Sequence, residues 1–371
     1  MKKIYFIIIY YIFIYNFIFS FAFAQGKKEQ VPFIFSESPQ YSTSEFITLE
    51  EIHKIDVDVF EEYYIYQVRA MDSDSYTNLY VLDFYESTIT VFDKNGKFIR
   101  TMGGKGQGPS EFIQPMSLSI INDKMYIYEE NKGMKVLDLQ CKYIDYFFVP
   151  LGNYYVFKAF DDFFLTVKID YDRSHNRKYI VTRFSKDFNE SYTVAEYLYK
   201  VNPKESFPIS AQEIVAMNSK QHVYFPGNFE EYKVNVYSIE GNIIKSFGRK
   251  YKRIPYSKQT RQWREEFFKK SAGPYSEPTK VSKYPPVVRD ILIDDRDYVW
   301  IIVGEWNRDC NNSFKVISTI DIFNENGEFL YTLEIPNIGL STFIKNGRLY
   351  TTPSYDDMYI RVFKIHYNYE N

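Results

Sequence analysis

Residues 79–102 read LYVLDFYESTITVFDKNGKFIRTM, and this stretch decides the fold class. It contains three short apolar runs, at 79–83, 89–92 and 97–102, which polar turns separate. The second turn, Asp93-Lys-Asn-Gly96, is a strong β-hairpin signal because Asn and Gly tolerate positive φ angles. The stretch therefore predicts three consecutive antiparallel β-strands.

The same unit of strands and turns recurs along the chain, at a spacing of about 40 to 70 residues. Clear further copies begin with His222–Phe225 and Tyr298–Ile302. A weaker apolar run precedes several copies, as at 64–68, 117–121 and 288–293, and we expect these runs to form the innermost strands. Repeats of this length predict an all-β fold, a six-bladed β-propeller of four-stranded blades. A pair of β-sandwiches, and propellers of five or seven blades, are the alternatives.

The sixth copy lacks an outer strand before the chain ends. The segment Phe46–Ile52 near the N-terminus could supply that strand and close the ring. Closure removes exposed sheet edges, which otherwise invite aggregation. We therefore expect a linker over residues 25–45 and a single propeller domain over residues 46–371.

Residues 251–286 do not follow the rhythm of the strands. Ser257–Lys270 is predicted to form a short helix, with Trp263 and Phe267 on one face, and four prolines follow it. We interpret the segment as an insertion between the fourth and fifth blades and not as a separate domain.

Residues 1–24 have the pattern of a secretory signal peptide. Lys2 and Lys3 precede an apolar run at 4–21, and Ala22-Phe-Ala24 matches a cleavage site. An uncleaved membrane anchor is the alternative, because the run approaches the length of a transmembrane helix. No Cys lies near the site, and no later segment is apolar enough to span a membrane. The sequence thus predicts a soluble, exported protein, periplasmic or extracellular, without a lipid anchor.

The chain contains 45 Lys and Arg and 48 Asp and Glu, for a formal net charge of −3. This balance argues against a nucleic acid or an anionic membrane surface as a partner. The two cysteines, Cys141 and Cys310, fall in the second and fifth predicted blades. Because a disulfide needs Cα atoms within about 7 Å, we expect two unpaired thiols. A monomer is the expected state.

The most distinctive link between blades is Gly103-Gly-Lys-Gly-Gln-Gly-Pro-Ser-Glu-Phe112. Its Gly-x-Gly is not a dinucleotide fingerprint, because no helix of a βαβ unit follows it. One interpretation is a structural crossover, in which glycine lets the chain turn sharply. The other is a ligand-binding loop whose N–H groups form an anion nest. Lys105, Gln107 and Glu111 are the candidates for ligand contact.

In a propeller, the links between blades share one face with the turns between second and third strands, around the mouth of the central channel. Exposed Trp and Arg side chains on that face are typical anchors for partners or sugars. For Trp263 the alternative is to pin the insertion onto the propeller. The candidates are Arg249 and Arg253 before the predicted helix, Trp263 and Arg264 within it, Trp306 and Arg308 in the fifth blade, and the acidic Asp356 in the sixth.

The run at 92–112 resembles the blade signature of six-bladed β-propellers that gut-type Bacteroidetes export, which are relatives of NHL-repeat propellers. The resemblance extends over about residues 46–366 and is most specific in the Gly-Lys-Gly-Gln-Gly-Pro-x-Glu-Phe link at 104–112. It implies the fold and export but no particular reaction. Many such relatives carry a lipoprotein cysteine, which this chain lacks.

Residues for catalysis are sparse. The four histidines fall in different repeats without the spacing of a zinc site. Asp170-Tyr-Asp172-Arg-Ser-His175 faintly resembles a calcium loop but lacks the glycine and terminal glutamate of an EF-hand. We therefore expect no cofactor, with calcium as the alternative.

The sequence thus favours an exported binding or interaction module and not an enzyme. A glycan, a peptide or an envelope protein is the expected partner. Related propeller enzymes place His, Asp, Asn or Glu around the channel mouth. A metal-dependent lyase or hydrolase with its site there is therefore the alternative.

Overall fold

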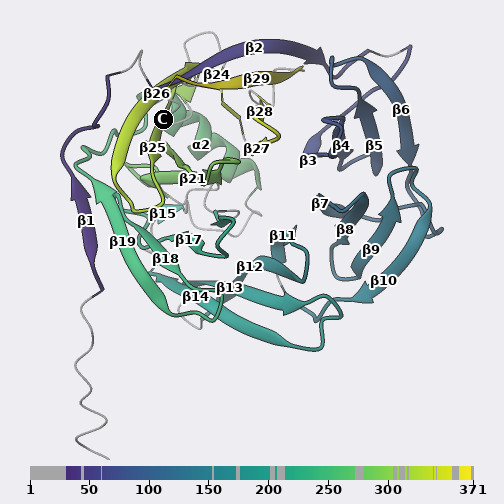
Figure 1. The fold of residues 1–371 in the computed structure, drawn as a ribbon, viewed down its shortest axis with the longest axis horizontal. Coiled ribbons are helices and arrows are strands. Elements are labelled where there is room, and N and C mark those ends of the chain that lie inside the picture. Colours follow the sequence, from purple (N-terminus) through teal and green to yellow (C-terminus); the bar gives the residue numbers. More distant parts are fainter. Residues whose placement is uncertain are drawn as a thin grey trace, which may run out of the picture. The chain divides into compact units, whose positions relative to one another are not determined.

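Six β-sheets follow one another around a central axis within residues Phe33–Asn371 (Figure 1). The prediction of a six-bladed β-propeller is confirmed. The computed structural model describes residues 31–42, 46–59, 61–152, 154–172, 176–200, 205–206, 214–271, 280–303, 307–308, 314–315, 317–336, 338–339, 341–352 and 359–368.

The first three blades each contain four strands, which run outward from the axis in chain order. Blade 1 contains β3 (Val68–Ser73), β4 (Leu79–Asp83), β5 (Thr88–Phe92) and β6 (Phe98–Gly103). Blade 2 contains β7 (Pro115–Ile121), β8 (Lys124–Glu129), β9 (Gly133–Asp138) and β10 (Tyr143–Phe148). Blade 3 contains β11 (Tyr154–Ala159), β12 (Phe163–Tyr171), β13 (Arg177–Ser185) and β14 (Ser191–Tyr199).

Of the last three blades, blades 4 and 6 include a strand from the N-terminal segment. Blade 4 contains β16 (Ala216–Met217), β17 (Val223–Pro226), β18 (Val234–Tyr237), β19 (Ile243–Arg249) and, outermost, β1 (Phe33–Ser36). Blade 5 contains β21 (Val288–Ile293), β22 (Val299–Val303), β25 (Ile317–Phe323) and β26 (Phe329–Pro336). Blade 6 contains β27 (Thr342–Lys345), β28 (Arg348–Thr351), β29 (Tyr359–Tyr367) and β2 (Ile47–Asp56).

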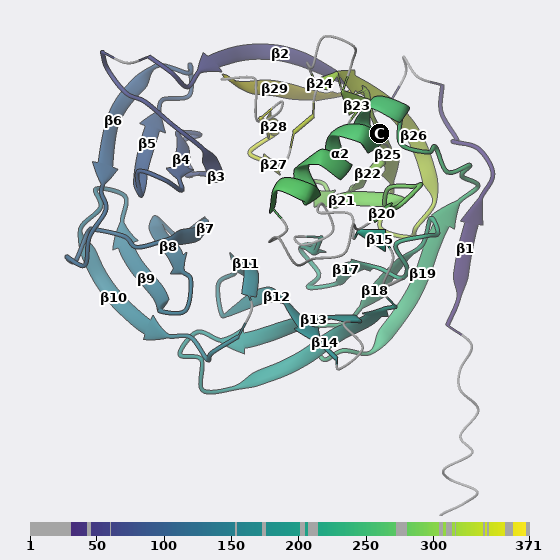
Figure 2. The ribbon, with the colours of Figure 1, turned by 180° about the vertical axis from the view of Figure 1, so that it is seen from behind.

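Short elements complete the described fold. The helix α2 (Lys258–Ser271) confirms the helix predicted for the insertion between blades 4 and 5. It lies over one end of blade 5 (Figure 2). The remaining strands form two small pairs, β15 (Glu205–Ser206) with β20 (Lys280–Val281), and β23 (Asn307–Arg308) with β24 (Phe314–Lys315).

The N-terminal segment closes the ring as predicted. β2 pairs antiparallel with β29, from Ile47 opposite Tyr367 to Asp56 opposite Tyr359. Ile47 is fully buried between blades 5 and 6. The first and last parts of the propeller domain are therefore joined in one sheet, which holds the ring shut.

The segment expected as a linker also contributes to the propeller, which corrects that assignment. Phe33–Ser36 forms β1, which pairs in parallel with β19. The backbone N–H groups of Gln40 and Tyr41 donate to carbonyls of β26, at 3.1 and 2.9 Å. We call residues 33–41 the strap. It adds backbone to the outer edges of blades 4 and 5, because those edges offer unpaired hydrogen-bonding groups.

The innermost strand of blade 1 also differs from the prediction. It is Val68–Ser73 and not 64–68, whereas the runs predicted for blades 2 and 5 lie in β7 and β21. The buried carboxylate of Asp83 accepts hydrogen bonds from the backbone N–H groups of Tyr66 and Gln67. These bonds hold residues 66–67 in the incoming link, so the strand begins only afterwards.

One polar motif builds the first hairpin turn of blades 1, 4 and 5. An Asp or Asn accepts the backbone N–H group four residues later and also bonds an aromatic side chain six residues later. The motif locks the turn to the second strand of the blade. The pairs are Asp74 with the Tyr80 hydroxyl (3.2 Å), Asn218 with the Tyr224 hydroxyl (3.3 Å) and Asp294 with the Trp300 indole (2.8 Å).

Cys141 lies in the turn between β9 and β10 and is a free, buried thiol. Cys310 lies outside the described residues. Burial raises the pKa of the Cys141 thiol, so little reactive thiolate forms near neutral pH. We expect Cys141 in a Cys310→Ser variant to resist DTNB while the protein is folded and to react once guanidinium unfolds it. Fast labelling of the folded variant would contradict this placement.

No helix in the described part of the chain is long and apolar enough to cross a membrane. The predicted signal peptide, residues 1–24, lies outside the described residues.

Candidate functional site

The structure separates the described candidates, which we expected to share the face around the channel mouth. The link that carries Lys105, Gln107 and Glu111 packs against β9 and β10, the two outer strands of blade 2. Arg249 and Arg253 line a second pocket beside blade 4. A third group of described candidates lies on the insertion helix α2, so the structure places the candidates at three separate positions.

Several polar side chains of the innermost strands form hydrogen bonds to other innermost strands. Arg69 of β3 donates from Nη2 to the carbonyl of Tyr155 in β11, at 3.4 Å. Lys345 of β27 donates to Asp72 of β3 at 2.8 Å and to the carbonyl of Ile120 at 2.9 Å. These contacts join blades 1, 2, 3 and 6 around the axis, so the side chains have a structural role there.

The first pocket, which we call the loop pocket, lies between the glycine-rich link and blade 2. Its volume is about 460 Å³. The side chains of Lys105 and Gln107 are exposed on the link. The pocket is lined by Gly106, Gln107, Gly108, Pro109, Glu129, Lys132, Lys135, Tyr143 and Tyr146.

Hydrogen bonds within the protein hold the glycine-rich link. The N–H group of Gly104 donates to Ser87 at 3.0 Å, and that of Gly106 donates to Phe112 at 3.1 Å. The N–H group of Gly108 donates to Oε2 of Glu111 at 2.8 Å. These three glycines are therefore not open to an anion, and Glu111 braces the loop. This geometry favours the structural interpretation of the link.

A buried pair of charged side chains, Lys135 and Glu129, holds the glycine-rich link in place. Lys135 is 7% exposed and donates to the carbonyls of Gly108, at 3.2 Å, and Glu111. Its Nζ atom lies 3.6 Å from Oε2 of Glu129, whose Oε1 accepts the Ile113 N–H group at 2.6 Å. Lys135 is not among the candidates predicted from the sequence. The available signal was a single Lys within the otherwise apolar strand 133–137.

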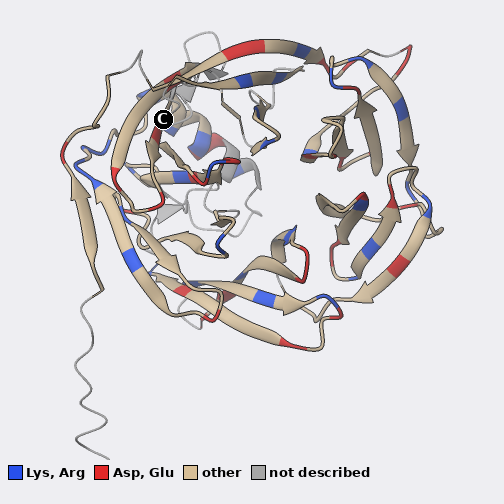
Figure 3. Cartoon of the chain, viewed as in Figure 1, with Lys and Arg blue, Asp and Glu red and all other residues tan. Residues whose placement is uncertain are grey.

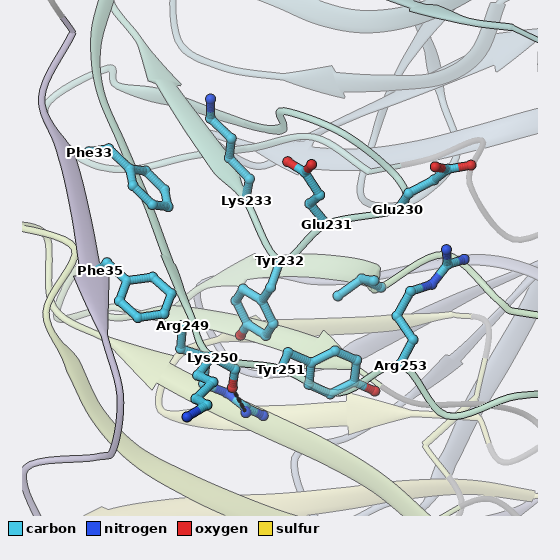
Figure 4. Close-up of a pocket in the computed structure, with 11 residues that line it drawn as sticks. Phe33, Phe35, Glu230, Glu231, Tyr232, Lys233, Arg249, Lys250, Tyr251 and Arg253 are labelled. Carbon is cyan, nitrogen blue, oxygen red and sulfur yellow. Dashed lines mark hydrogen bonds between the residues drawn. The ribbon is translucent and has the colours of Figure 1, made fainter.

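The second pocket, which we call the strap pocket, lies between the strap, the 227–233 turn of blade 4 and the start of the insertion (Figure 4). Its volume is about 540 Å³. It contains both of the described candidates that precede the insertion helix. The pocket is lined by Phe33, Phe35, Glu230, Glu231, Tyr232, Lys233, Arg249, Lys250, Tyr251, Arg253 and Val287.

Two aromatic rings of the strap form one wall of this pocket. Phe33 and Phe35 are 50% and 53% exposed, and their ring centroids are 6.2 Å apart. Side chains two residues apart in a strand point to the same face. Figure 4 shows both rings directed toward Tyr232. These two residues are not among the candidates predicted from the sequence, because they lie in the segment that was expected to be a linker.

Arg249 forms the floor of the pocket and is bound to a buried carboxylate. Its Nε atom lies 2.7 Å from Oδ2 of Asp321, a residue with no exposed surface. The Tyr232 hydroxyl donates to the same oxygen at 2.7 Å. Burial opposes the charge of Arg249, but the Asp321 carboxylate outweighs this effect and raises the guanidinium pKa. Arg249 thus holds blades 4 and 5 together as well as lining the pocket.

The other charged groups of the strap pocket lie nearer to solvent. Arg253 is half-buried, donates from Nη2 to the carbonyl of Pro285 at 3.1 Å and stacks over the Tyr284 ring at 4.6 Å. Glu230, Glu231 and Lys250 are exposed. The pocket therefore offers cations, carboxylates and aromatic rings together.

The candidates of the insertion helix lie outside both pockets. Trp263 is half-buried on α2, and the Arg264 guanidinium stacks over the buried Tyr256 ring at 4.5 Å. Trp306 and Asp356 lie outside the described residues. Arg308 lies in β23, with a side chain outside the described part.

The described residues contain no group of three or more His, Cys, Asp or Glu side chains that could hold a metal ion. In the segment that resembles a calcium loop, Asp172 accepts hydrogen bonds from the backbone and side chain of Asn176, at 2.9 and 2.8 Å. Residues 173–175 lie outside the described range. The described contacts of Asp172 are those of a turn.

Comparison with known protein families identifies the family of this chain. Residues 35–273, more than half of the sequence, match the model of a family described as a 6-bladed beta-propeller, DUF5128. The chain belongs to this family. The family match confirms the blade number and the resemblance to six-bladed propellers. The comparison of this chain with curated proteins found no match.

Solved structures with the same architecture are distant in sequence. A Bacteroides fragilis protein whose name describes it as exported has 11% identity and a TM-score of 0.50, over 90% of this chain and 99% of its own. A DUF4221 member from Bacteroides vulgatus has 13% identity and a TM-score of 0.49, over 87% and 99%. Virginiamycin B lyase from Staphylococcus aureus has 10% identity and a TM-score of 0.46, over 86% and 99%. At these identities the likeness shows the fold alone.

Proposed function

We propose that this propeller is an exported ligand-binding module whose strap pocket holds an acidic saccharide. The predicted signal peptide at residues 1–24 supports export. The observation that carries the binding proposal is the pair of half-exposed rings, Phe33 and Phe35, facing charged groups across one pocket. Ligand pockets combine an apolar surface with a few polar groups that set orientation.

Each class of side chain in the strap pocket suits one part of such a ligand. The rings of Phe33 and Phe35 offer flat faces for the C–H surface of a sugar ring. Arg253 and Lys250 supply cations for a carboxylate. The carboxylate of Glu230 accepts hydrogen bonds from sugar hydroxyls. A neutral sugar would leave the cations unused.

The floor of the strap pocket is organised before a ligand binds. Arg249 is held by Asp321 and stacks against the rings of Tyr232 and Tyr251, with centroids 5.1 and 5.2 Å from the guanidinium carbon. Groups that are already ordered lose little conformational entropy on binding, so more of the contact energy appears as affinity.

The direct test is calorimetry and thermal unfolding of the protein from Gln25 onward with trigalacturonate. Its methyl ester is the control, since it has the same rings without the charges. A ligand that binds only the folded state stabilises it by about 2.7 kcal/mol at a hundredfold excess over Kd. Binding of trigalacturonate but not of the ester supports the proposal. Equal binding of both, or of neither, contradicts it.

Two further measurements distinguish the saccharide-binding module from the competing functions. Stronger binding of hexaglutamate than of trigalacturonate would indicate a peptide ligand in place of a saccharide. Binding or turnover that disappears after EDTA dialysis and returns with calcium would favour the metal-dependent lyase or hydrolase.

The strap rings provide a prediction by mutation. We expect Phe33→Ala/Phe35→Ala to weaken trigalacturonate binding by about tenfold to hundredfold, since each aromatic contact contributes about 0.5–1.5 kcal/mol. Both side chains are half-exposed, so the unfolding temperature of the free protein should change little. Phe148→Ala is the matched control, because Phe148 is 81% exposed and lies on blade 2. Equal affinities in the two variants would exclude the strap pocket as the site.

A further inference from the structure

The outer edges of the blades are not covered equally. β1 adds to blade 4, the strap backbone adds to blade 5, and β2 is the outermost strand of blade 6. β6, β10 and β14 are the last strands of blades 1, 2 and 3 (Figure 1). Within the described residues, these three sheets therefore end in an open edge.

Among these edges, β10 is the most apolar. Its sequence, YIDYFF, contains one acidic residue and no basic one (Figure 3). Tyr143, Ile144 and Phe148 are 43%, 43% and 81% exposed, and Leu151 shortly after the strand is 85% exposed. Proteins usually guard an open edge with Lys or Pro. The β6 edge carries Arg100, whose Nη2 atom donates to the Leu139 carbonyl of blade 2 at 2.6 Å. The β14 edge, like β10, carries one acidic residue and no basic one, but its Glu196 pairs with Lys178 at 2.8 Å.

The loop pocket lies directly beside this edge. Tyr143 and Tyr146 of β10 line it, opposite Gln107 and Pro109 of the glycine-rich link. When a peptide adds to a sheet edge, main-chain hydrogen bonds supply affinity, and a pocket for alternate side chains supplies specificity. Blade 2 has both features next to each other.

The charges of the loop pocket indicate which side chain it would accept. Lys135 and Glu129 already pair with each other and with the link. Lys132 lines the pocket, is exposed and makes no ion pair among the described residues. Lys105 is exposed on the same link. Among the described residues, the charge in this pocket that lacks a counterion is therefore positive, which suits an acidic side chain of a ligand.

We propose that β10 and the loop pocket form a docking groove for an extended acidic peptide segment of a partner protein. The segment adds to blade 2 as a fifth strand, as β1 adds to blade 4. Its acidic side chains reach Lys132, and its apolar side chains lie against Tyr143 and Phe148. This gives the glycine-rich link a role, since it forms the opposite wall of the groove.

The probe is an acetylated and amidated octapeptide of alternating Glu and Val, with the Lys and Val octapeptide as its control. Fluorescence anisotropy measures binding, and hydrogen exchange of backbone amides measures where the peptide adds. We expect the acidic peptide to bind, the basic peptide not to bind, and exchange to slow in residues 143–148.

Variants separate this groove from the strap pocket. Lys132→Glu should weaken binding of the acidic peptide by about tenfold, since it replaces a charge-assisted contact with a repulsive one. Lys124→Glu changes an exposed lysine at the far end of blade 2 and should leave the affinity unchanged. Phe33→Ala/Phe35→Ala should also leave it unchanged, so the two proposals fail independently.

Three results would overturn the proposal. They are binding that Lys132→Glu does not weaken, slowed exchange that falls outside residues 143–148, and no binding of the acidic peptide. Light scattering adds a fourth, because a dimer of the free protein that protects residues 143–148 would make a second copy the occupant of the edge.

Discussion

Replacing Arg249 with alanine lowers the free energy of unfolding by about 3–5 kcal/mol, the range expected when one partner of a buried ion pair is removed. Asp321 has no exposed surface, so the variant leaves a buried carboxylate without the cation that pairs with it. The remaining donors to this carboxylate are the hydroxyls of Tyr232, at 2.7 Å, and Thr332, at 2.9 Å. Urea unfolding followed by tryptophan fluorescence measures the loss.

Two further variants show whether the buried charge is the cause. Arg253→Ala lies in the same pocket but removes only a half-buried group, and it should cost less than about 1 kcal/mol. Adding Asp321→Asn to Arg249→Ala removes the uncompensated charge and should recover part of the loss. A loss no larger for Arg249→Ala than for Arg253→Ala would show that Arg249 acts mainly as a ligand contact.

The second large effect is expected for Asp294→Asn, at about 2–3 kcal/mol. Oδ2 of Asp294 accepts the Trp300 indole N–H at 2.8 Å and the Tyr367 hydroxyl at 2.6 Å. In the variant an amide N–H₂ group takes the position of this oxygen. An indole can only donate, so its buried N–H group would lose its partner. Urea unfolding again provides the measurement.

The matched control for Asp294→Asn is Asp74→Asn in blade 1. Oδ2 of Asp74 accepts the Tyr80 hydroxyl and the Asn78 side-chain amide, and each of these groups can turn to accept from the new amide instead. Blade 4 already has this arrangement, with Asn218 donating to the Tyr224 hydroxyl. Asp74→Asn should therefore cost less than about 1 kcal/mol. Equal losses at both positions would mean that the indole bond is unimportant.

The Asp294 carboxyl also predicts a pH dependence. Burial raises its pKa, although the hydrogen bonds from Tyr367 and Trp300 oppose the shift. The folded state therefore binds this proton more tightly than the unfolded state does. The resulting stabilisation is complete below the ordinary pKa of Asp and is lost as the pH rises through the raised value. The stability difference between the wild type and Asp294→Asn should widen as the pH falls from 7 toward 4.

The local sequence pattern was sufficient to predict much of the fold. The Asp-x-Asn-Gly turn at 93–96 and its counterparts predicted the hairpins, because such turns depend on a few adjacent residues. The helix predicted at Ser257–Lys270 is observed at Lys258–Ser271. The closing strand was recognised because the sixth repeat lacks one. Each of these predictions used information within one repeat or the count of repeats.

The sequence could not sort the candidate site residues by role, because each role depends on contacts between distant segments. Arg249 was a candidate for ligand contact, but its buried partner, Asp321, is 72 residues away in the sequence. Glu111 was a candidate in the same way, and its carboxylate braces its own loop. Phe33 and Phe35 were assigned to a linker, since a run of four residues does not show whether a sheet edge is available for it.

The sequence by itself determined the repeat, the number of blades and the closure of the ring. The reason is that the turn residues and the alternation of apolar and polar residues lie within each blade. Only the tertiary structure decided which polar residues line a pocket and which are buried in pairs. It also decided where the strap lies and that the described candidates separate into the glycine-rich link, the strap pocket and the insertion helix. The physical reason is that burial and pairing of a charge depend on neighbours that the fold brings from other blades.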